Sequence, residues 1–180
     1  MYSKLRHYFF PVITIILLFT GSPSLQAQDN TVPSTEAFKI TGAVENELNI
    51  SIKDLLTFKQ ENLGDITLKN KRGKVKGEAR GMKGVLLKTV LDSAHVHATK
   101  PKEYSELCIS LIASDNYRNV YSWNEIYNTE VGDHVYIITE MDGKPIDLMP
   151  QRILVMSLAD FNSGRRRLKG LERIEVKKVQ

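Results

Sequence analysis

Short β-forming segments outnumber helical segments in this chain of 180 residues and do not alternate with them. The clearest is Leu107 to Ala113 (LCISLIA), whose successive apolar residues are typical of a strand buried on both faces. Val135 to Met141 is strongly β-forming and ends at Asp142-Gly143, a favoured tight-turn pair. Arg152 to Met156 and Arg173 to Val179 add two more predicted strands. This order favours an α+β fold with mixed β-sheets and a few short helices over a doubly wound parallel sheet.

The helical signals are few and short. Apolar side chains recur at helical spacing between Gly84 and Ala94, which predicts a helix that begins at Gly84. Ser51, followed by Asp54 three residues later, predicts the start of another helix. Residues 123–127 are predicted to form one helical turn, and the polar, basic and glycine-rich residues 70–84 are predicted to form a loop.

The first 27 residues have the pattern of an export signal. A basic start is followed by the apolar segment Tyr8 to Phe19 and by small residues that end at Ala27. Because the apolar segment is short for a membrane span, we expect cleavage after Ala27, export to the periplasm or medium, and no stable membrane insertion afterwards. An uncleaved anchor is the alternative. Residues 28–37 are predicted to be a flexible leader and residues 38–180 a single domain.

Charge and cysteine content limit the possible partners. A net charge of +4 is too mild to indicate nucleic-acid binding, and the single cysteine, Cys108, cannot form an internal disulfide. The apolar neighbours of Cys108 predict a buried packing role rather than a nucleophile. His95 and His97 are two residues apart, but no carboxylate or cysteine stands beside them at ligand spacing, so no metal site is predicted.

Two basic segments are candidate anion sites. The first alternates lysine or arginine with glycine between Lys69 and Gly84, a composition that suits a phosphate cradle but is more typical of a solvated hairpin with charged edges. The second combines Arg152 with Lys169 and the run Arg165 to Arg167, where the alternative is a surface charge run.

A series of landmarks resembles the molybdopterin-binding domain of the sulfite oxidase family over residues 38–179. They are Gly84-Val85-Leu86-Leu87, Ser114-Asp115-Asn116-Tyr117, Met141 to Ile146, Pro150-Gln151-Arg152 and Arg167 to Val176. The resemblance implies that family's fold, and it implies that Arg152 and Lys169 lie near a bound pterin cofactor. Asn116 stands where the family has glycine, and asparagine is the next-best residue for a left-handed backbone.

The family's molybdenum-binding cysteine has no counterpart in this chain. It would fall between Thr67 and Gly84, and residues 28–107 contain no cysteine at all. Lys69 or Asn70 cannot replace a thiolate bond to a soft metal. The family's closing tryptophan is also replaced, by Gly170.

We therefore predict an exported binding or accessory protein with a sulfite-oxidase-type molybdopterin-binding fold and without molybdenum catalysis. Its ligand would be a small anion or pterin-like molecule, and molybdopterin is the cofactor that the resemblance implies. The predicted binding residues are Arg72, Arg80, Asn116, Tyr117, Arg152 and Lys169. Two alternatives stay open: a molybdopterin-dependent oxidoreductase with an unconventional metal attachment, and a protein-interaction domain with no small ligand.

Overall fold

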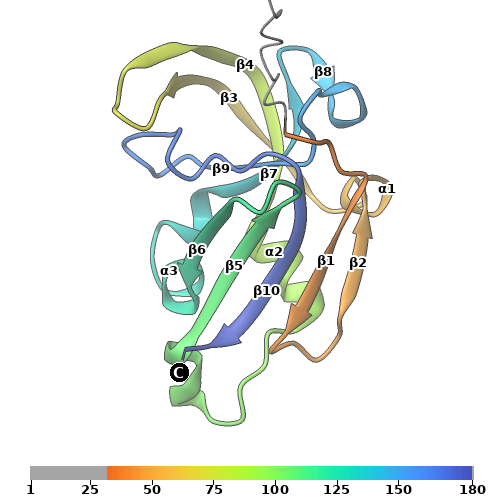
Figure 1. Cartoon of the computed structure of the whole chain (residues 1–180), viewed down its shortest axis with the longest axis vertical. Coiled ribbons are helices and arrows are strands. Elements are labelled where there is room, and N and C mark those ends of the chain that lie inside the picture. Colours follow the sequence, from red (N-terminus) through yellow and green to blue (C-terminus); the bar gives the residue numbers. More distant parts are fainter. Residues whose placement is uncertain (1–31, 180) are drawn as a thin grey trace, which may run out of the picture. The chain divides into compact units, whose positions relative to one another are not determined.

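The computed structural model describes residues 32–179, which form two β-sheets joined by short helices (Figure 1). The α+β class predicted from the sequence is confirmed. The predicted export signal, residues 1–27, lies outside the described residues. No helix within residues 32–179 is both long enough and apolar enough to cross a bilayer.

The first sheet brings together segments from both ends of the described chain. Its strands, in spatial order, are β2 (Leu48–Ser51), β1 (Ala37–Gly42), β10 (Leu171–Lys178), β5 (Leu107–Ala113) and β6 (Arg118–Ser122). β1 and β10 run parallel and all other neighbours are antiparallel, so this sheet is mixed. The predicted strands in residues 107–113 and 173–179 are thus neighbours in space.

The second sheet is antiparallel throughout. It contains β3 (Gln60–Lys69), β4 (Val75–Leu86), β7 (Val135–Met141) and β8 (Lys144–Pro145), and β9 (Leu154–Ser157) also pairs with β7. Asp142 and Gly143 both have positive φ, 55° and 71°, as a two-residue hairpin turn of type I′ requires. The tight turn predicted at this pair is confirmed.

The helices are short and their starts are locally determined. They are α1 (Ile52–Leu55), α2 (Leu87–Ala94) and α3 (Trp123–Tyr127), with 3₁₀ turns η1 (Pro101–Glu106), η2 (Gly132–His134) and η3 (Ile146–Leu148). Ser51 Oγ accepts a hydrogen bond from the Asp54 N–H at 3.2 Å, and the Ser51 N–H donates to Asp54 Oδ2 at 3.0 Å. This reciprocal capping box confirms the predicted start of α1.

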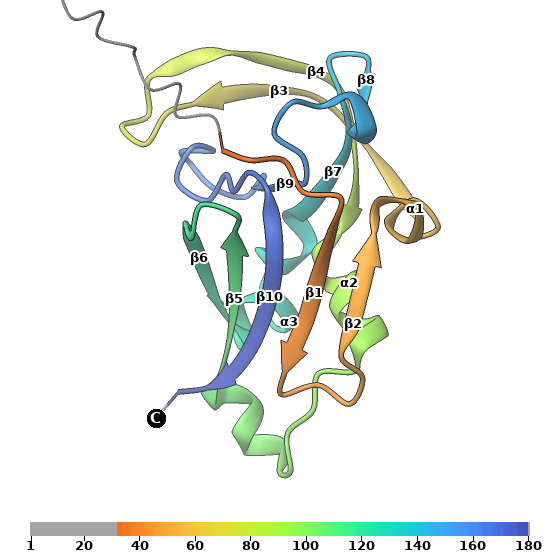
Figure 2. The same cartoon turned by 45° about the vertical axis from the view of Figure 1, so that its right-hand side comes forward.

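The predicted start of α2 at Gly84 is wrong by three residues. Gly84 and Val85 pair with Ile138 and Ile137 of β7, so these residues extend β4 and the helix begins at Leu87. The apolar face of α2 is buried against the first sheet in the main hydrophobic core, and Figures 1 and 2 show α2 behind that sheet. The boundary between β4 and α2 is thus determined by pairing with β7, which leaves no signal in the local sequence.

β5 alternates instead of being buried on both faces along its whole length. Leu107, Ile109 and Leu111 are buried, whereas Cys108 and Ser110 are half-buried on the opposite face. Cys108 is therefore only partly buried, less than its apolar neighbours predict. In the sequence, Cys108 and Ser110 interrupt the apolar run at alternate positions, and this pattern indicates the alternation.

Most of the predicted loop at residues 70–84 is strand β4. A second, smaller hydrophobic cluster explains the difference: Ala79 and Met82 of β4 are buried in it with Tyr136 and Ile138 of β7. The other side chains at the start of β4 are exposed, which accounts for the basic composition. Only residues 70–74 form a turn, so the structure matches the hairpin alternative.

Candidate anion-binding site

Four segments far apart in the sequence line a small cationic pocket of about 170 Å³. They are the residues before β1, the turn of the β3–β4 hairpin, the turn between β5 and β6, and the segment that precedes β10. The lining residues are Val32, Lys71, Asp115, Tyr117, Arg167 and Lys169. Three cationic side chains thus share the pocket with one carboxylate.

The β5–β6 turn positions the aromatic wall of the pocket. Asn116 adopts the left-handed conformation expected from the sequence, with φ of 66°, and its N–H donates to the Ala113 carbonyl at 2.9 Å. The Asp115 carboxylate accepts a hydrogen bond from the Tyr117 N–H at 2.9 Å. The Tyr117 hydroxyl in turn donates to the Arg165 carbonyl at 2.8 Å, which orients the ring between the two neighbouring segments.

The segment before β10 is attached to the hairpin through backbone groups. The Lys69 N–H donates to Ser163 Oγ at 2.9 Å, and Arg165 Nε donates to the Lys71 carbonyl at 3.0 Å. Gly164 packs so closely that a Cβ there would lie 2.6 Å from the Lys69 carbonyl oxygen. Lys71 Nζ lies 5.4 Å from the centroid of the Tyr117 ring, within cation–π range. The pocket walls are therefore held by specific contacts.

Arg167 is the residue that makes this pocket a candidate binding site. Its Nε is buried and has no hydrogen-bond partner among the described residues, and its guanidinium forms no ion pair within residues 32–179. Burial lowers the pKa of Arg167, although the charge of Asp142 opposes the shift. Burial, and then the charge of Arg167, also lower the pKa of Lys169. Two partly desolvated cations side by side are costly, and a bound anion would relieve that cost.

The structure brings together only two of the six predicted binding residues. Tyr117 and Lys169 line the pocket. Asn116 shapes the adjacent turn but is itself exposed. Arg72 is exposed in the hairpin turn, where its N–H donates to Asn70 Oδ1 at 2.9 Å.

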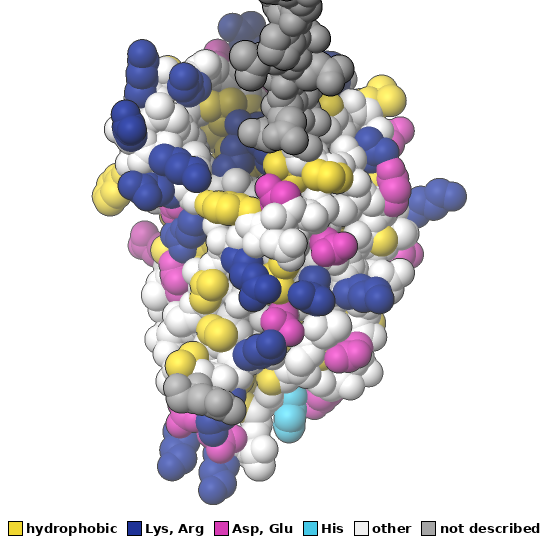
Figure 3. Space-filling model, in the orientation of Figure 1, with side chains coloured by type: hydrophobic (Ala, Val, Ile, Leu, Met, Phe, Trp, Pro, Cys, Tyr) yellow, Lys and Arg dark blue, Asp and Glu magenta, His cyan; other side chains and the backbone are white. Residues whose placement is uncertain are grey.

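The two remaining predicted residues have partners elsewhere. Arg80 on β4 forms an exposed ion pair with Glu78, at 3.2 Å between Nε and Oε2. Arg152 forms an ion pair with Glu36, a residue of the predicted leader, and it does not line the pocket. Figure 3 shows Lys and Arg side chains gathered over the β3–β4 hairpin on the face drawn. Most of them point to solvent, as the hairpin alternative expects.

Sequence reasoning did not select Lys71 or Arg167 as binding residues. Lys71 was one of six basic residues in the predicted loop, and Arg167 was one of three consecutive arginines. The alternating composition gives no sign of which cation faces inward. Arg167 differs from Arg165 and Arg166 in that its Nε is buried without a partner among the described residues. Arg152 and Arg173 share this feature but do not line the pocket, and only the three-dimensional packing reveals it.

A solved structure has a fold similar to that of this chain. It is the structure of the sulfane dehydrogenase SoxCD from Paracoccus pantotrophus, which matches with a TM-score of 0.60 and 16% sequence identity. The match covers 83% of this chain and 41% of that chain, so the present chain spans less than half of the length of its structural relative. No family model matches the chain. No curated protein matches it.

The residues fit one part of the molybdopterin cofactor that the sequence resemblance implies. Arg167, Lys169 and Lys71 suit its phosphate, because guanidinium and ammonium groups bind phosphate oxygens. A thiolate for molybdenum is missing, since β3 and β4 carry no cysteine. Cys108 lies seven residues before Asp115, roughly 20 Å away along β5. Within residues 32–179 there is also no cluster of three His, Cys, Asp or Glu side chains that suits a metal ion.

Proposed function

We propose that this protein is an exported binding or accessory module with a sulfite-oxidase-type molybdopterin-binding fold, which holds a small anionic ligand without molybdenum chemistry. The observation that carries the proposal is the buried, unpartnered Nε of Arg167 beside Lys169. The structural likeness to a sulfane dehydrogenase supports the choice of fold. The missing thiolate supports a role for this fold without molybdenum chemistry.

The size and chemistry of the pocket indicate the class of ligand. A volume of about 170 Å³ accommodates a tetrahedral oxyanion or the phosphate end of a larger molecule. The guanidinium of Arg167 presents a planar fork of donors that matches two oxygens of such a group, and Lys169 adds a point charge. Asp115 is the one acid in the lining, and its carboxylate is already engaged by the Tyr117 N–H. The ligand is therefore an oxyanion or a phosphorylated pterin-like molecule.

Thermal denaturation of the purified protein with phosphate, sulfate and pterin phosphates tests this proposal. Ligand at one hundred times its Kd stabilises a folded protein by about 2.7 kcal/mol, which gives a measurable rise in Tm. Arg167→Gln and Lys169→Gln should each abolish that rise. Lys53→Gln, at an exposed position on α1, removes the same charge and should preserve it. The absence of stabilisation by every anion would refute the proposed site and favour a protein-interaction domain.

Metal analysis of protein matured in a molybdenum-competent host separates the proposal from an active oxidoreductase. We expect no stoichiometric molybdenum, because no thiolate is available near the pocket. One molybdenum per chain would refute the proposal and establish an unconventional attachment.

A further inference from the structure

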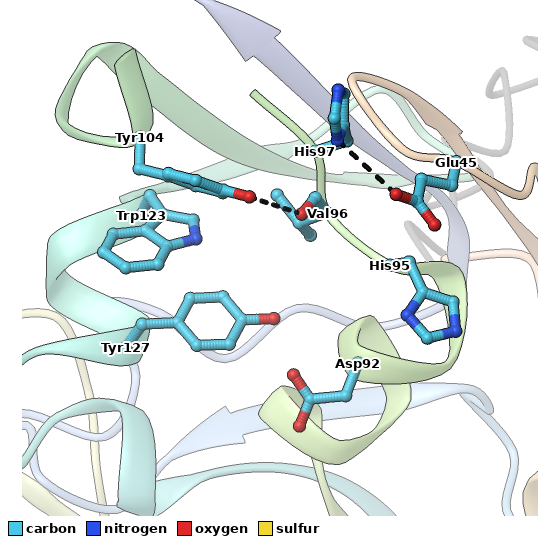
Figure 4. A pocket seen from close by; sticks show the side chains of 8 residues that line it. All are labelled: Glu45, Asp92, His95, Val96, His97, Tyr104, Trp123 and Tyr127. Carbon is cyan, nitrogen blue, oxygen red and sulfur yellow. Dashed lines mark hydrogen bonds and ion pairs between the residues drawn. The ribbon is translucent and has the colours of Figure 1, made fainter. Parts of the chain in front are cut away.

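A larger cavity lies at the opposite end of β5 from the cationic pocket. Its volume is about 460 Å³, and η1, which directly precedes β5, supplies part of its wall. The cationic pocket, in contrast, is built around the turn that follows β5. The lining residues, drawn in Figure 4, are Glu45, Asp92, His95, Val96, His97, Tyr104, Trp123 and Tyr127.

One wall of this cavity is an aromatic stack. The rings of Trp123 and Tyr127 are stacked with their centroids 4.9 Å apart, and Tyr104 lies 4.8 Å from the other side of Trp123 at a tilt of 43°. Because its neighbours cover both faces of Trp123, the indole offers its edge to the cavity. Figure 4 shows the indole nitrogen and the Tyr127 hydroxyl pointing inward, toward the opposite wall. This wall therefore combines apolar surface with two hydrogen-bonding groups.

The opposite wall carries two carboxylates and two imidazoles. Glu45 Oε1 lies 3.5 Å from His97 Nδ1, whereas Asp92 forms no ion pair within the described part of the chain. Burial, followed by the negative charge of Asp92, raises the pKa of the Tyr127 hydroxyl. The Tyr127 hydroxyl points toward this wall (Figure 4). No lysine or arginine lines the cavity, although the whole chain carries a net charge of +4.

His95 is held at the rim by an unusual backbone conformation. It caps the end of α2 with a left-handed φ of 54°, and its N–H donates to the Asp92 carbonyl at 3.1 Å. Non-glycine residues rarely adopt this conformation. It sets the direction in which the chain leaves α2, so that His95 and His97 both reach the cavity.

We propose that this cavity binds a small organic amine, whose ammonium group donates hydrogen bonds to Asp92 and Glu45 while its apolar body lies against Tyr127 and Tyr104. Carboxylates recognise an ammonium group through charge-assisted hydrogen bonds, and no lysine or arginine in the lining competes for them. The partly buried rings of Tyr104 and Tyr127, which line the cavity, favour the same ligand through cation–π attraction. A neutral sugar is a poorer match, because stacking needs an open aromatic face and those of Trp123 are covered.

The single tryptophan of the chain provides a direct readout of binding. Phenethylamine titrated into the protein should change the emission of Trp123 in a saturable way. The neutral counterpart 2-phenylethanol should bind about tenfold more weakly or worse, since hydrogen bonds to charged groups contribute about 1.5–3 kcal/mol. Asp92→Asn should weaken the amine by a similar factor. Asp147→Asn removes an exposed charge outside the cavity and should leave the titration unchanged.

Three outcomes would overturn this proposal. They are equal binding of the amine and the alcohol, unchanged amine affinity in Asp92→Asn, and no saturable response to the amine up to about 10 mM, far above the affinity range of specific sites. Unchanged far-ultraviolet circular dichroism confirms that each variant is folded. If Asp92→Asn does not fold, Glu45→Gln in the exposed segment before β2 serves in its place, and full amine affinity in that variant would overturn the proposal.

Discussion

Replacement of Arg166 by methionine should destabilise the protein strongly at neutral pH. The Arg166 guanidinium donates to Asp160 through Nε at 2.9 Å and Nη2 at 2.5 Å, and it also pairs with Glu125. It lies 4.5 Å from the centroid of the buried Tyr121 ring. The Asp160 side chain is only 11% exposed, so methionine would leave a nearly buried carboxylate without its cation. Arg166 is thus the structural member of the arginine run.

The expected magnitude follows from the degree of burial. Removal of one partner from a fully buried ion pair costs about 3–5 kcal/mol. Arg166 is 24% exposed, so water weakens the interaction and the lower end of that range applies. The lost cation–π contact adds about 0.5–1 kcal/mol, and the methionine side chain recovers some packing. We therefore expect Arg166→Met to lower the free energy of unfolding by about 3 kcal/mol.

Urea denaturation at two pH values tests both the size and the cause of this effect. Burial alone would raise the pKa of Asp160, but hydrogen bonds from Arg166 and Ser157 and the charge of Arg166 lower it. A carboxyl group with a lowered folded-state pKa stabilises the fold above its unfolded pKa, and the stabilisation disappears as the pH falls through the folded pKa. The destabilisation by Arg166→Met should thus be largest at neutral pH and shrink below about pH 4.

A double variant separates the uncompensated charge from lost packing. Arg166→Met combined with Asp160→Asn removes both charges, so it should be clearly more stable than Arg166→Met alone at neutral pH. An unfolding free energy within about 0.5 kcal/mol of the wild type for the single variant would refute the reasoning. So would a double variant whose destabilisation equals the sum of the two single variants.

Four further substitutions test particular elements. Gly132→Ala should lower the free energy of unfolding by more than about 3 kcal/mol or prevent folding, because the new Cβ would lie 1.7 Å from the Ile126 carbonyl oxygen. Gly143→Ala should lower it by only about 1–2 kcal/mol, because that position has open space around it and only its positive φ is unfavourable. Thermal denaturation of both variants compares the two effects. Ser51→Ala should lower the unfolding free energy by about 1 kcal/mol through loss of the capping box, measured by urea denaturation. Cys108→Ser should leave the anion-dependent rise in Tm unchanged, and its loss would contradict the placement of the pocket.

Elements with complete local signals were predictable from the sequence. The Asp142-Gly143 turn needs only two residues that tolerate positive φ, and the capping box at Ser51 needs only residues three apart. β4 has no such signal, because most of its side chains face solvent and its first two buried side chains, Ala79 and Met82, are three residues apart. Pairing with β3 and β7 makes this segment a strand although its side chains do not alternate. That pairing depends on segments up to sixty residues away.

The larger cavity was beyond the reach of sequence reasoning for a related reason. From the sequence, His95 and His97 are only a pair two residues apart, a spacing that suggests metal binding but lacks further ligands. The groups that give them a different meaning come from three other segments: Glu45 lies before β2, Tyr104 lies in η1, and Trp123 and Tyr127 lie in α3 after β6. Each segment alone looks like an ordinary polar or aromatic stretch. The chemistry of the cavity exists only where the fold brings these segments together.

The run of three arginines shows how one sequence pattern divides into three physical roles. Arg165 donates to the backbone of the hairpin turn and thereby holds the pocket wall. Arg166 is fully engaged by two carboxylates and the Tyr121 ring. Arg167 is the one arginine of this run with a buried nitrogen that has no partner in the described residues. An arginine whose donors are already paired within the fold has few donors left for a ligand. Arg167, whose Nε is unpaired, therefore identifies the candidate site. Substitution of Arg166 should therefore affect stability first, and substitution of Arg167 should affect anion binding first.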